Sequence, residues 1–95
     1  MLLRFDWVIY TMSGKVLVGK VAKYYNELGV IAIELLDELG VGDTMYIETT
    51  SAKLEQKVRS MEIEHIPVNH GFRGDSVGVK VDQPVEEGSE VYKLI

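Results

Sequence analysis

The chain has no cysteine, two prolines and only four asparagine or glutamine residues among its 95 positions. Without cysteine it can form no disulfide framework, no thiolate metal site and no cysteine nucleophile. The scarcity of amide side chains, beside plentiful lysine and glutamate, is typical of proteins from thermophiles.

Positive charge is also in short supply. Ten basic residues face fifteen acidic ones, which gives a formal net charge of −5. This balance opposes broad attraction to polyphosphate and to anionic lipid, so neither DNA nor a membrane is expected as a partner. The most apolar stretch, at the N-terminus, is interrupted by Arg4 and Asp6 and is far shorter than the roughly 20 residues that span a bilayer. We therefore expect a cytoplasmic protein.

The length allows one hydrophobic core. A chain of 95 residues with 46% hydrophobic content can bury one compact core and has no room for a second domain. Residues 1–13 are expected to form an N-terminal arm, which is either an edge strand or dispensable. Residues 14–95 are expected to form the folded domain.

A turn followed by a strand recurs along the sequence. The pairs Gly42 with Asp43, Gly74 with Asp75 and Gly88 with Ser89 each precede a β-type run. Glycine supplies a positive φ without a Cβ clash, and aspartate or serine stabilises a turn through its own backbone. Each pair therefore predicts a chain reversal into a new strand.

Strands are also predicted between these turns. Residues 16–25, 30–36 and 54–65 have β-type runs, with a bulge or bend at Gly19 and another near Arg59 and Ser60. An open sheet of short strands would leave exposed edges. The prediction is therefore an all-β fold, a closed six- to seven-stranded antiparallel Greek-key barrel.

The sequence nominates no catalytic or metal site. His65 and His70 are the only imidazoles, and their spacing matches no recognised zinc pattern. The Gly14 and Lys15 pair lacks the upstream glycine and the hydroxyl of a phosphate loop, so GTP binding is not expected from this chain. We expect no cofactor, no metal and no enzymatic activity.

Five segments, in this order and spacing, carry a family resemblance: GKV at 19–21, LGVGDTMYI at 39–47, VRSMEI at 58–63, GDSVGV at 74–79 and EGSEVY at 87–92. Together they resemble the β-barrel second domain of translational GTPases such as elongation factor Tu. The resemblance covers roughly residues 15–94. Similar barrels occur as a C-terminal accessory domain in some collagenase-like peptidases and as small free-standing archaeal proteins, and the chain looks most like the free-standing kind.

The resemblance implies a binding surface. In elongation factor Tu this barrel helps to hold the aminoacyl end of tRNA, and Glu62 corresponds to a glutamate of that site, whereas His65 and Ser76 stand where the family has arginine and asparagine. Lysines and arginines near the predicted bend could grip RNA phosphates, with an aromatic ring for stacking. The candidate binding residues are Lys57, Arg59, Glu62, His65, Phe72 and Arg73.

Two functions are therefore considered. The first is a non-enzymatic binding module related to translation-factor barrels that contacts RNA, the ribosome or a translation-related protein, and it requires a contiguous basic face. The alternative is a protein-interaction or scaffold domain akin to the accessory barrel of collagenase-like peptidases. That alternative requires an exposed apolar patch or a paired edge strand.

Overall fold

The computed structural model describes residues 14–95, and each regular element in this part of the chain is a β-strand. The ten strands are β1 (Lys15–Tyr25), β2 (Val30–Leu35), β3 (Leu39–Gly40), β4 (Thr44–Glu48), β5 (Lys53–Lys57), β6 (Met61–Ile63), β7 (Ile66–Val68), β8 (His70–Gly71), β9 (Ser76–Lys80) and β10 (Glu90–Leu94). The predicted all-β class is confirmed. Residues 14–95 contain no helix long and apolar enough to cross a membrane. The predicted arm, residues 1–13, lies outside the described residues.

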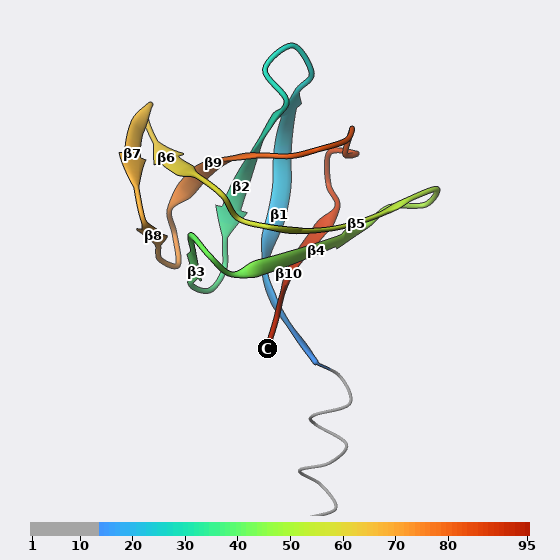
Figure 1. Cartoon of the computed structure of the whole chain (residues 1–95), viewed down its shortest axis with the longest axis horizontal. Helices are drawn as coiled ribbons and strands as arrows, with labels where there is room; N and C mark the ends of the chain where they lie inside the picture. The colour runs from blue at the N-terminus through green and yellow to red at the C-terminus, as the bar shows by residue number, and fades with distance from the viewer. Residues whose placement is uncertain (1–13) are drawn as a thin grey trace, which may run out of the picture.

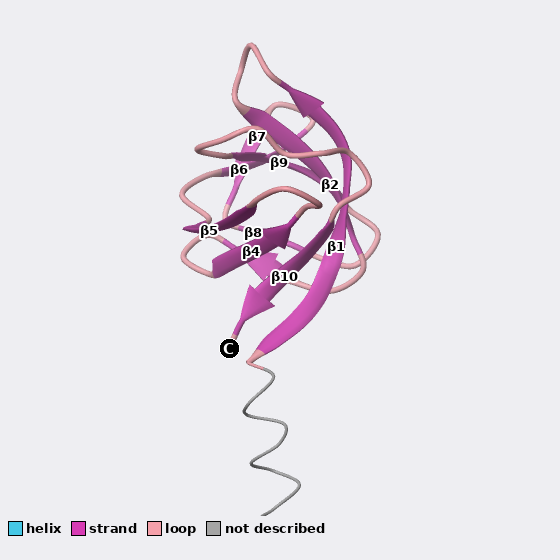
Figure 2. Ribbon diagram, turned by 90° about the vertical axis from the view of Figure 1, so that its right-hand side faces the viewer, coloured by secondary structure: helices cyan, strands magenta, loops and turns pink. Residues whose placement is uncertain are grey.

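Eight strands form one antiparallel sheet in the order β5-β4-β10-β1-β2-β9-β6-β7, and β3 pairs with β8 in a separate ribbon. In Figure 1, β1, β2 and β10 run upright while β4, β5 and β9 cross them. Figure 2, turned by 90°, places β5 and β6 on the side opposite β1. The sheet thus curls around the core that its inner face supplies.

The predicted closure of the barrel is not confirmed, and the main sheet has eight strands instead of the predicted six to seven. The edge strands β5 and β7 do not pair with each other, so no sheet in residues 14–95 closes on itself. The prediction assumed that closure is needed to remove exposed edges, but both edges carry other protection. β5 alternates exposed Lys53, Glu55 and Lys57 with buried residues, and β7 has Pro67 at its centre. Charges and proline both discourage edge-to-edge pairing.

The three predicted glycine turns are confirmed. Gly42, Gly74 and Gly88 have φ values of 100°, 94° and 89°. The residue after each glycine donates its backbone N–H to the carbonyl three positions earlier, over 3.1 Å for Asp43, 2.9 Å for Asp75 and 3.2 Å for Ser89. This repeated hydrogen bond, with glycine third of the four residues, is the geometry of a type II turn.

The long strand predicted for residues 54–65 is divided. It is β5 and β6 separated by residues 58–60, close to the predicted bend. Val58 is buried at this corner, where its N–H donates to the Asp43 carbonyl and its carbonyl accepts from the Gly42 N–H, both over 2.9 Å. These bonds hold Val58 against the residues that come directly before β4, at the point where the β4–β5 ladder ends. The short strands β3, β7 and β8 were not predicted from the sequence.

The core is built almost wholly from aliphatic side chains on the inner face of the curled sheet. Its members are Val18, Val21, Ile31, Ile33, Leu35, Leu39, Met45, Ile47, Leu54, Val58, Met61, Val77, Val79, Val81, Val85 and Val91. The bulge predicted at Gly19 is confirmed, because the pairing of β1 with β10 shifts register between Leu17 and Gly19. The bulge increases the bend of β1 and lets one long strand follow the curvature of the sheet.

Candidate functional site

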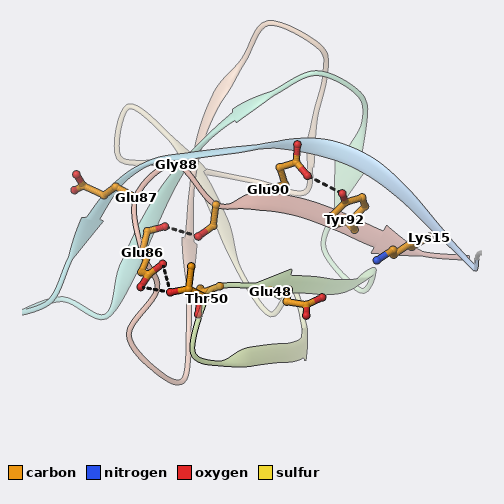
Figure 3. A pocket seen from close by; sticks show the side chains of 10 residues that line it. Lys15, Glu48, Thr50, Glu86, Glu87, Gly88, Glu90 and Tyr92 are labelled. Carbon is orange, nitrogen blue, oxygen red and sulfur yellow. Dashed lines mark hydrogen bonds between the residues drawn. The ribbon is translucent and has the colours of Figure 1, made fainter.

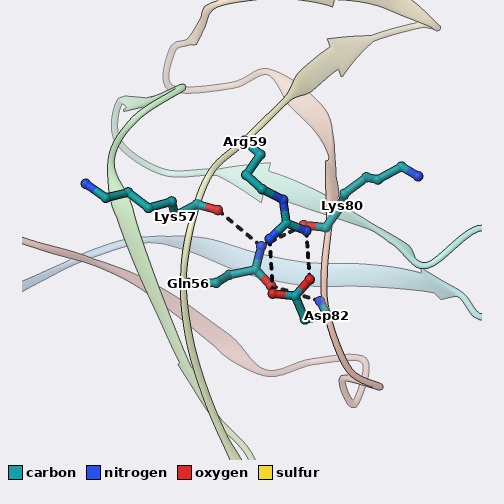
Figure 4. Close-up of polar contacts among 5 residues, drawn as sticks. All are labelled: Gln56, Lys57, Arg59, Lys80 and Asp82. Atoms are coloured by element: carbon teal, nitrogen blue, oxygen red, sulfur yellow. Dashed lines mark hydrogen bonds and ion pairs between the residues drawn. The ribbon is translucent and has the colours of Figure 1, made fainter.

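The basic residues proposed to contact RNA do not form one free face. Arg59 makes a two-pronged ion pair with Asp82, with Nη1 and Nη2 at 3.0 and 2.8 Å from the two carboxylate oxygens. Lys57 Nζ donates to the Gly42 carbonyl over 3.3 Å. Figure 4 shows the ends of Lys57 and Lys80 extending in opposite directions. The hydrogen bonds from Arg59 lower the pKa of the Asp82 carboxyl, and the same bonds raise the pKa of the guanidinium.

The other four candidates fall into two groups. Phe72 and Arg73 lie in the turn between β8 and β9, where the Phe72 ring contacts the His70 ring with centroids 4.7 Å apart. Glu62 lies on β6, and His65 lies in the turn from β6 to β7 with its Nδ1 3.7 Å from Glu62 Oε1. Of the six candidates, the structure therefore brings Glu62 and His65 together beside a groove.

This groove, which we call the β9 groove, is a cavity of about 580 Å³ on the outer face of the sheet. Its lining residues are Tyr25, Leu28, Val30, Glu62, Glu64, His65, Ser76, Val77, Gly78 and Lys80. The turn between β1 and β2 contributes one wall, the turn between β6 and β7 contributes the other, and β9 crosses the floor. Sequence analysis missed Leu28 and Gly78, although an exposed leucine in a turn and a glycine within a strand were both visible.

Strand register explains why the surface is hollow here. Val77 and Val79 point into the core, so the alternate residues Ser76, Gly78 and Lys80 lie on the outer face of β9. Gly78 pairs with Ala32 of β2 on one side and with Glu62 of β6 on the other. Across the outer face, the three neighbouring residues are therefore Ala32, Gly78 and Glu62. The middle residue has no side chain, and Ala32 beside it has only a methyl group.

The turn that overhangs the groove is held in an unusual backbone conformation. Glu64 and His65 connect Ile63 to Ile66 in a two-residue hairpin loop, with φ values of 52° and 67°. Two consecutive positive φ values are the mark of a type I′ turn, which favours asparagine and glycine. Most other residues with a Cβ, including glutamate and histidine, are strained in this conformation. This strain lies at the rim of the groove.

Replacing this turn with its preferred residues is expected to stabilise the protein. The double change Glu64→Asn/His65→Gly should raise the free energy of unfolding by about 1 kcal/mol, because both residues tolerate positive φ. Urea denaturation at fixed temperature measures the change. His65→Ala keeps a Cβ at this position, so it serves as the control and should not raise the free energy of unfolding. An equal gain from His65→Ala would show that backbone strain is not the cause.

A second cavity, of about 540 Å³, lies between the β4–β5 turn and residues 86–92 (Figure 3). The one lysine among its lining residues is already engaged within the chain, because Lys15 Nζ lies 4.5 Å from the centre of the Tyr92 ring and 5.0 Å from that of Tyr46. Hydrogen bonds to Glu48 and Glu90 raise the pKa of the Tyr46 and Tyr92 hydroxyls, respectively. Cation–π contacts of this kind stabilise the ends of β1, β4 and β10.

Residues 14–95 contain no cluster of three or more histidine, aspartate or glutamate side chains placed to hold a metal ion. Their buried side-chain nitrogen and oxygen atoms all have hydrogen-bond partners. The β9 groove is therefore the candidate site, and its chemistry is that of a binding surface: apolar on one wall and charged on the other.

Comparison with known sequences points toward peptidases. No family model matches the chain. An uncharacterized protease of Methanocaldococcus jannaschii is 40% identical over 81 residues, which cover 84% of this chain and 20% of that protein. A collagenase of Porphyromonas gingivalis is 31% identical over 82 residues, which cover 84% of this chain and 20% of the collagenase. The chain thus spans about a fifth of the length of these relatives.

Solved structures agree on the fold. The C-terminal domain of a U32 peptidase from Geobacillus thermoleovorans superposes with a TM-score of 0.78 and 17% identity, covering 83% of this chain and 92% of that domain. A bacterial selenocysteine-specific elongation factor gives a TM-score of 0.59 and 18% identity, covering 83% of this chain and 14% of the factor. Both likenesses support a barrel-type β-domain.

These comparisons correct the first functional prediction. The prediction of a translation-factor module, related to the second domain of elongation factor Tu, was wrong. The fold is shared with an elongation factor, but the sequence relatives are a protease and collagenases. The resemblance was misleading because both groups use a similar β-architecture, which reports the fold and not the ligand.

Proposed function

We propose that this chain is a peptidase-associated accessory β-domain and that it acts as a non-catalytic protein-binding module. The observation that carries this proposal is the 40% identity to a protease over 84% of this chain but only 20% of the protease. A separately folded C-terminal domain of a U32 peptidase, 92% covered by this chain, supports it. In this proposal a separate catalytic domain cleaves the polypeptide substrate, and the β-domain binds that substrate.

The surface fits protein binding better than RNA binding. The β9 groove exposes Tyr25 and Leu28, which are 44% and 64% accessible. Exposed apolar side chains that gather in a groove are typical of protein-interaction sites. In contrast, Arg59 is neutralised by Asp82, and the chain carries a net charge of −5. The scaffold alternative called for an exposed apolar patch or a paired edge strand. In residues 14–95 the exposed apolar side chains of the groove favour it, whereas charges and a proline protect both sheet edges from pairing.

Binding to unfolded polypeptides tests the proposal. Fluorescence anisotropy would follow labelled gelatin, labelled reduced and carboxymethylated lactalbumin, and labelled tRNA, at roughly 50 and 200 mM salt. We expect the two polypeptides to bind at both salt concentrations, because apolar contacts are little screened, and tRNA not to bind. Gel electrophoresis of the same mixtures should show both polypeptides intact.

Two results would contradict the proposal. If neither polypeptide binds, the chain is not a polypeptide-binding module. The second result is cleavage of either polypeptide by the purified chain. If this cleavage persists when inhibitors of contaminating proteases are added, the non-catalytic assignment fails. The prediction that the chain does not bind GTP can be checked by the same method with a fluorescently labelled GTP analogue. Polypeptide binding in buffer without any added cofactor would agree with the prediction that none is needed.

A further inference from the structure

We propose that the β9 groove binds an extended polypeptide segment, with an apolar side chain seated over Gly78 and a lysine or arginine next to it facing Glu62 and Glu64. This inference rests on the proposed protein-binding function and assigns it a site and a ligand class. It follows from the shape of the floor, the exposure of one wall and the charge of the other.

The floor is open at a glycine that the fold does not require. A Cβ added at Gly78 would find its nearest neighbours at 3.6 Å (Val30 Cγ1) and 3.9 Å (Glu62 Cγ), which are ordinary contact distances. The φ of Gly78 is not positive either. Glycine inside a strand weakens the strand and often marks a place where another chain approaches closely. Because packing does not demand glycine here, the space over β9 is available to a ligand.

The wall on the β1–β2 side offers apolar contact. Tyr25 and Leu28 remain exposed, and Val30 lies half-buried below them at the start of β2. Leu28 is held in place because its N–H and that of Gly29 both donate to the Tyr25 carbonyl, over 3.1 and 2.9 Å. A side chain entering over Gly78 would therefore be covered by aliphatic and aromatic groups on a fixed turn.

The opposite wall carries the charge. Glu62 projects from β6 directly beside Gly78, and Glu64 lines the same cavity from the hairpin turn, whereas Lys80 is the one lysine or arginine among the lining residues. The lining thus places two carboxylates, Glu62 and Glu64, against the single ammonium group of Lys80. A cationic side chain next to the apolar anchor complements this wall, and a phosphate would be repelled by it.

Strand addition is not the expected binding mode. In a two-residue hairpin the flanking pair, Ile63 and Ile66, exchanges hydrogen bonds, so the next residue on β7 directs its backbone outward. That residue is Pro67, which has no N–H to donate. At the other edge, β5 presents lysines and glutamate. A bound segment therefore gains its specificity from side chains in the groove, not from pairing with a sheet edge.

Three labelled nonapeptides with a glycine and serine background test the proposal by fluorescence anisotropy. One carries a central leucine followed by lysine, the second replaces the leucine by serine, and the third replaces the lysine by glutamate. We expect the leucine-lysine peptide to bind the full chain at least about tenfold more tightly than either of the others, since burying one leucine and pairing one charge each contribute on this scale.

Variants locate the site. Gly78→Val fills the floor at a position where an added Cβ meets only ordinary contacts. It should keep the urea midpoint of the wild type and bind the leucine-lysine peptide at least about tenfold more weakly. Glu62→Gln/Glu64→Gln should remove the preference for lysine over glutamate. Glu48→Gln/Glu55→Gln, with the same charge change away from the groove, should leave that preference unchanged.

The outcomes separate this inference from the function on which it rests. If the wild type binds neither gelatin nor any nonapeptide, the protein-binding function itself fails. If gelatin binds and a folded Gly78→Val variant binds it and the leucine-lysine peptide as tightly as the wild type, the function stands and the groove assignment is overturned. Equal affinity of the wild type for all three nonapeptides overturns the ligand class.

Discussion

Gly19→Ala is expected to destabilise the protein by about 2 to 3 kcal/mol, because the new methyl group would collide with backbone that cannot move aside. A Cβ at position 19 would lie 2.5 Å from the Glu34 carbonyl oxygen and 2.8 Å from Ile33 Cγ2. Gly19 sits in the bulge of β1 and pairs with Leu35 of β2, so relieving the collision requires β1 and β2 to separate. Urea denaturation with an unchanged m-value would measure the loss.

Gly78→Ala is the matched control for this prediction. It makes the same chemical change within a strand of the same sheet, but its methyl group would meet only ordinary contacts. We expect the free energy of unfolding to change by less than about 0.5 kcal/mol or to rise slightly, since alanine loses less backbone freedom on folding than glycine. Equal losses from Gly19→Ala and Gly78→Ala would show that the bulge does not hold β1 against β2 as closely as the structure indicates.

The features that could be predicted from sequence are those set by local chemistry. Gly42, Gly74 and Gly88 mark their turns because positive φ excludes most other residues, whatever the rest of the chain does. The alternation of Val77 and Val79 with Ser76 and Gly78 likewise predicts which face of β9 is buried. These signals depend on neighbours in the sequence, and they identify most of the strands.

The features that could not be predicted depend on distant partners. Whether β5 pairs with β7 depends on the curvature of the whole eight-stranded sheet. This curvature cannot be predicted from any short segment of the sequence. The β9 groove joins Leu28, Glu62 and Gly78, which are far apart in the chain and meet only through the pairing of β2, β9 and β6. Arg59 was assigned to RNA because its partner, Asp82, lies 23 residues away.

Gln56→Leu is expected to destabilise the protein by about 2 kcal/mol, because Gln56 bonds the β5 edge to the chain beyond β9. Its side chain, only 8% exposed, donates to the Lys80 carbonyl over 2.9 Å and accepts from the Asp82 N–H over 2.9 Å. Leucine fills a similar volume but satisfies neither backbone group, and each lost hydrogen bond costs about 1 kcal/mol. Figure 4 shows this side chain between Lys57 and Asp82. These side-chain bonds join the β5 edge to the C-terminal end of β9, two strands that do not pair with each other.

Gln56→Glu separates the hydrogen bonds from the volume of the side chain, because its effect should depend on pH. The introduced carboxylate can accept from the Asp82 N–H but faces the Lys80 carbonyl without a proton to donate, so its pKa in the folded state should lie above the value of about 4.3 in the unfolded chain. Once protonated, it can make both bonds.

A raised folded-state pKa contributes stability that is present below the unfolded value and is lost as the pH rises through the folded value. The stability deficit relative to wild type should therefore be largest at pH 7 and shrink toward pH 4, where the Arg59 pair with Asp82 affects both proteins equally. A deficit that stays constant across this range would mean that the donated bond to Lys80 does not hold β5 to the end of β9.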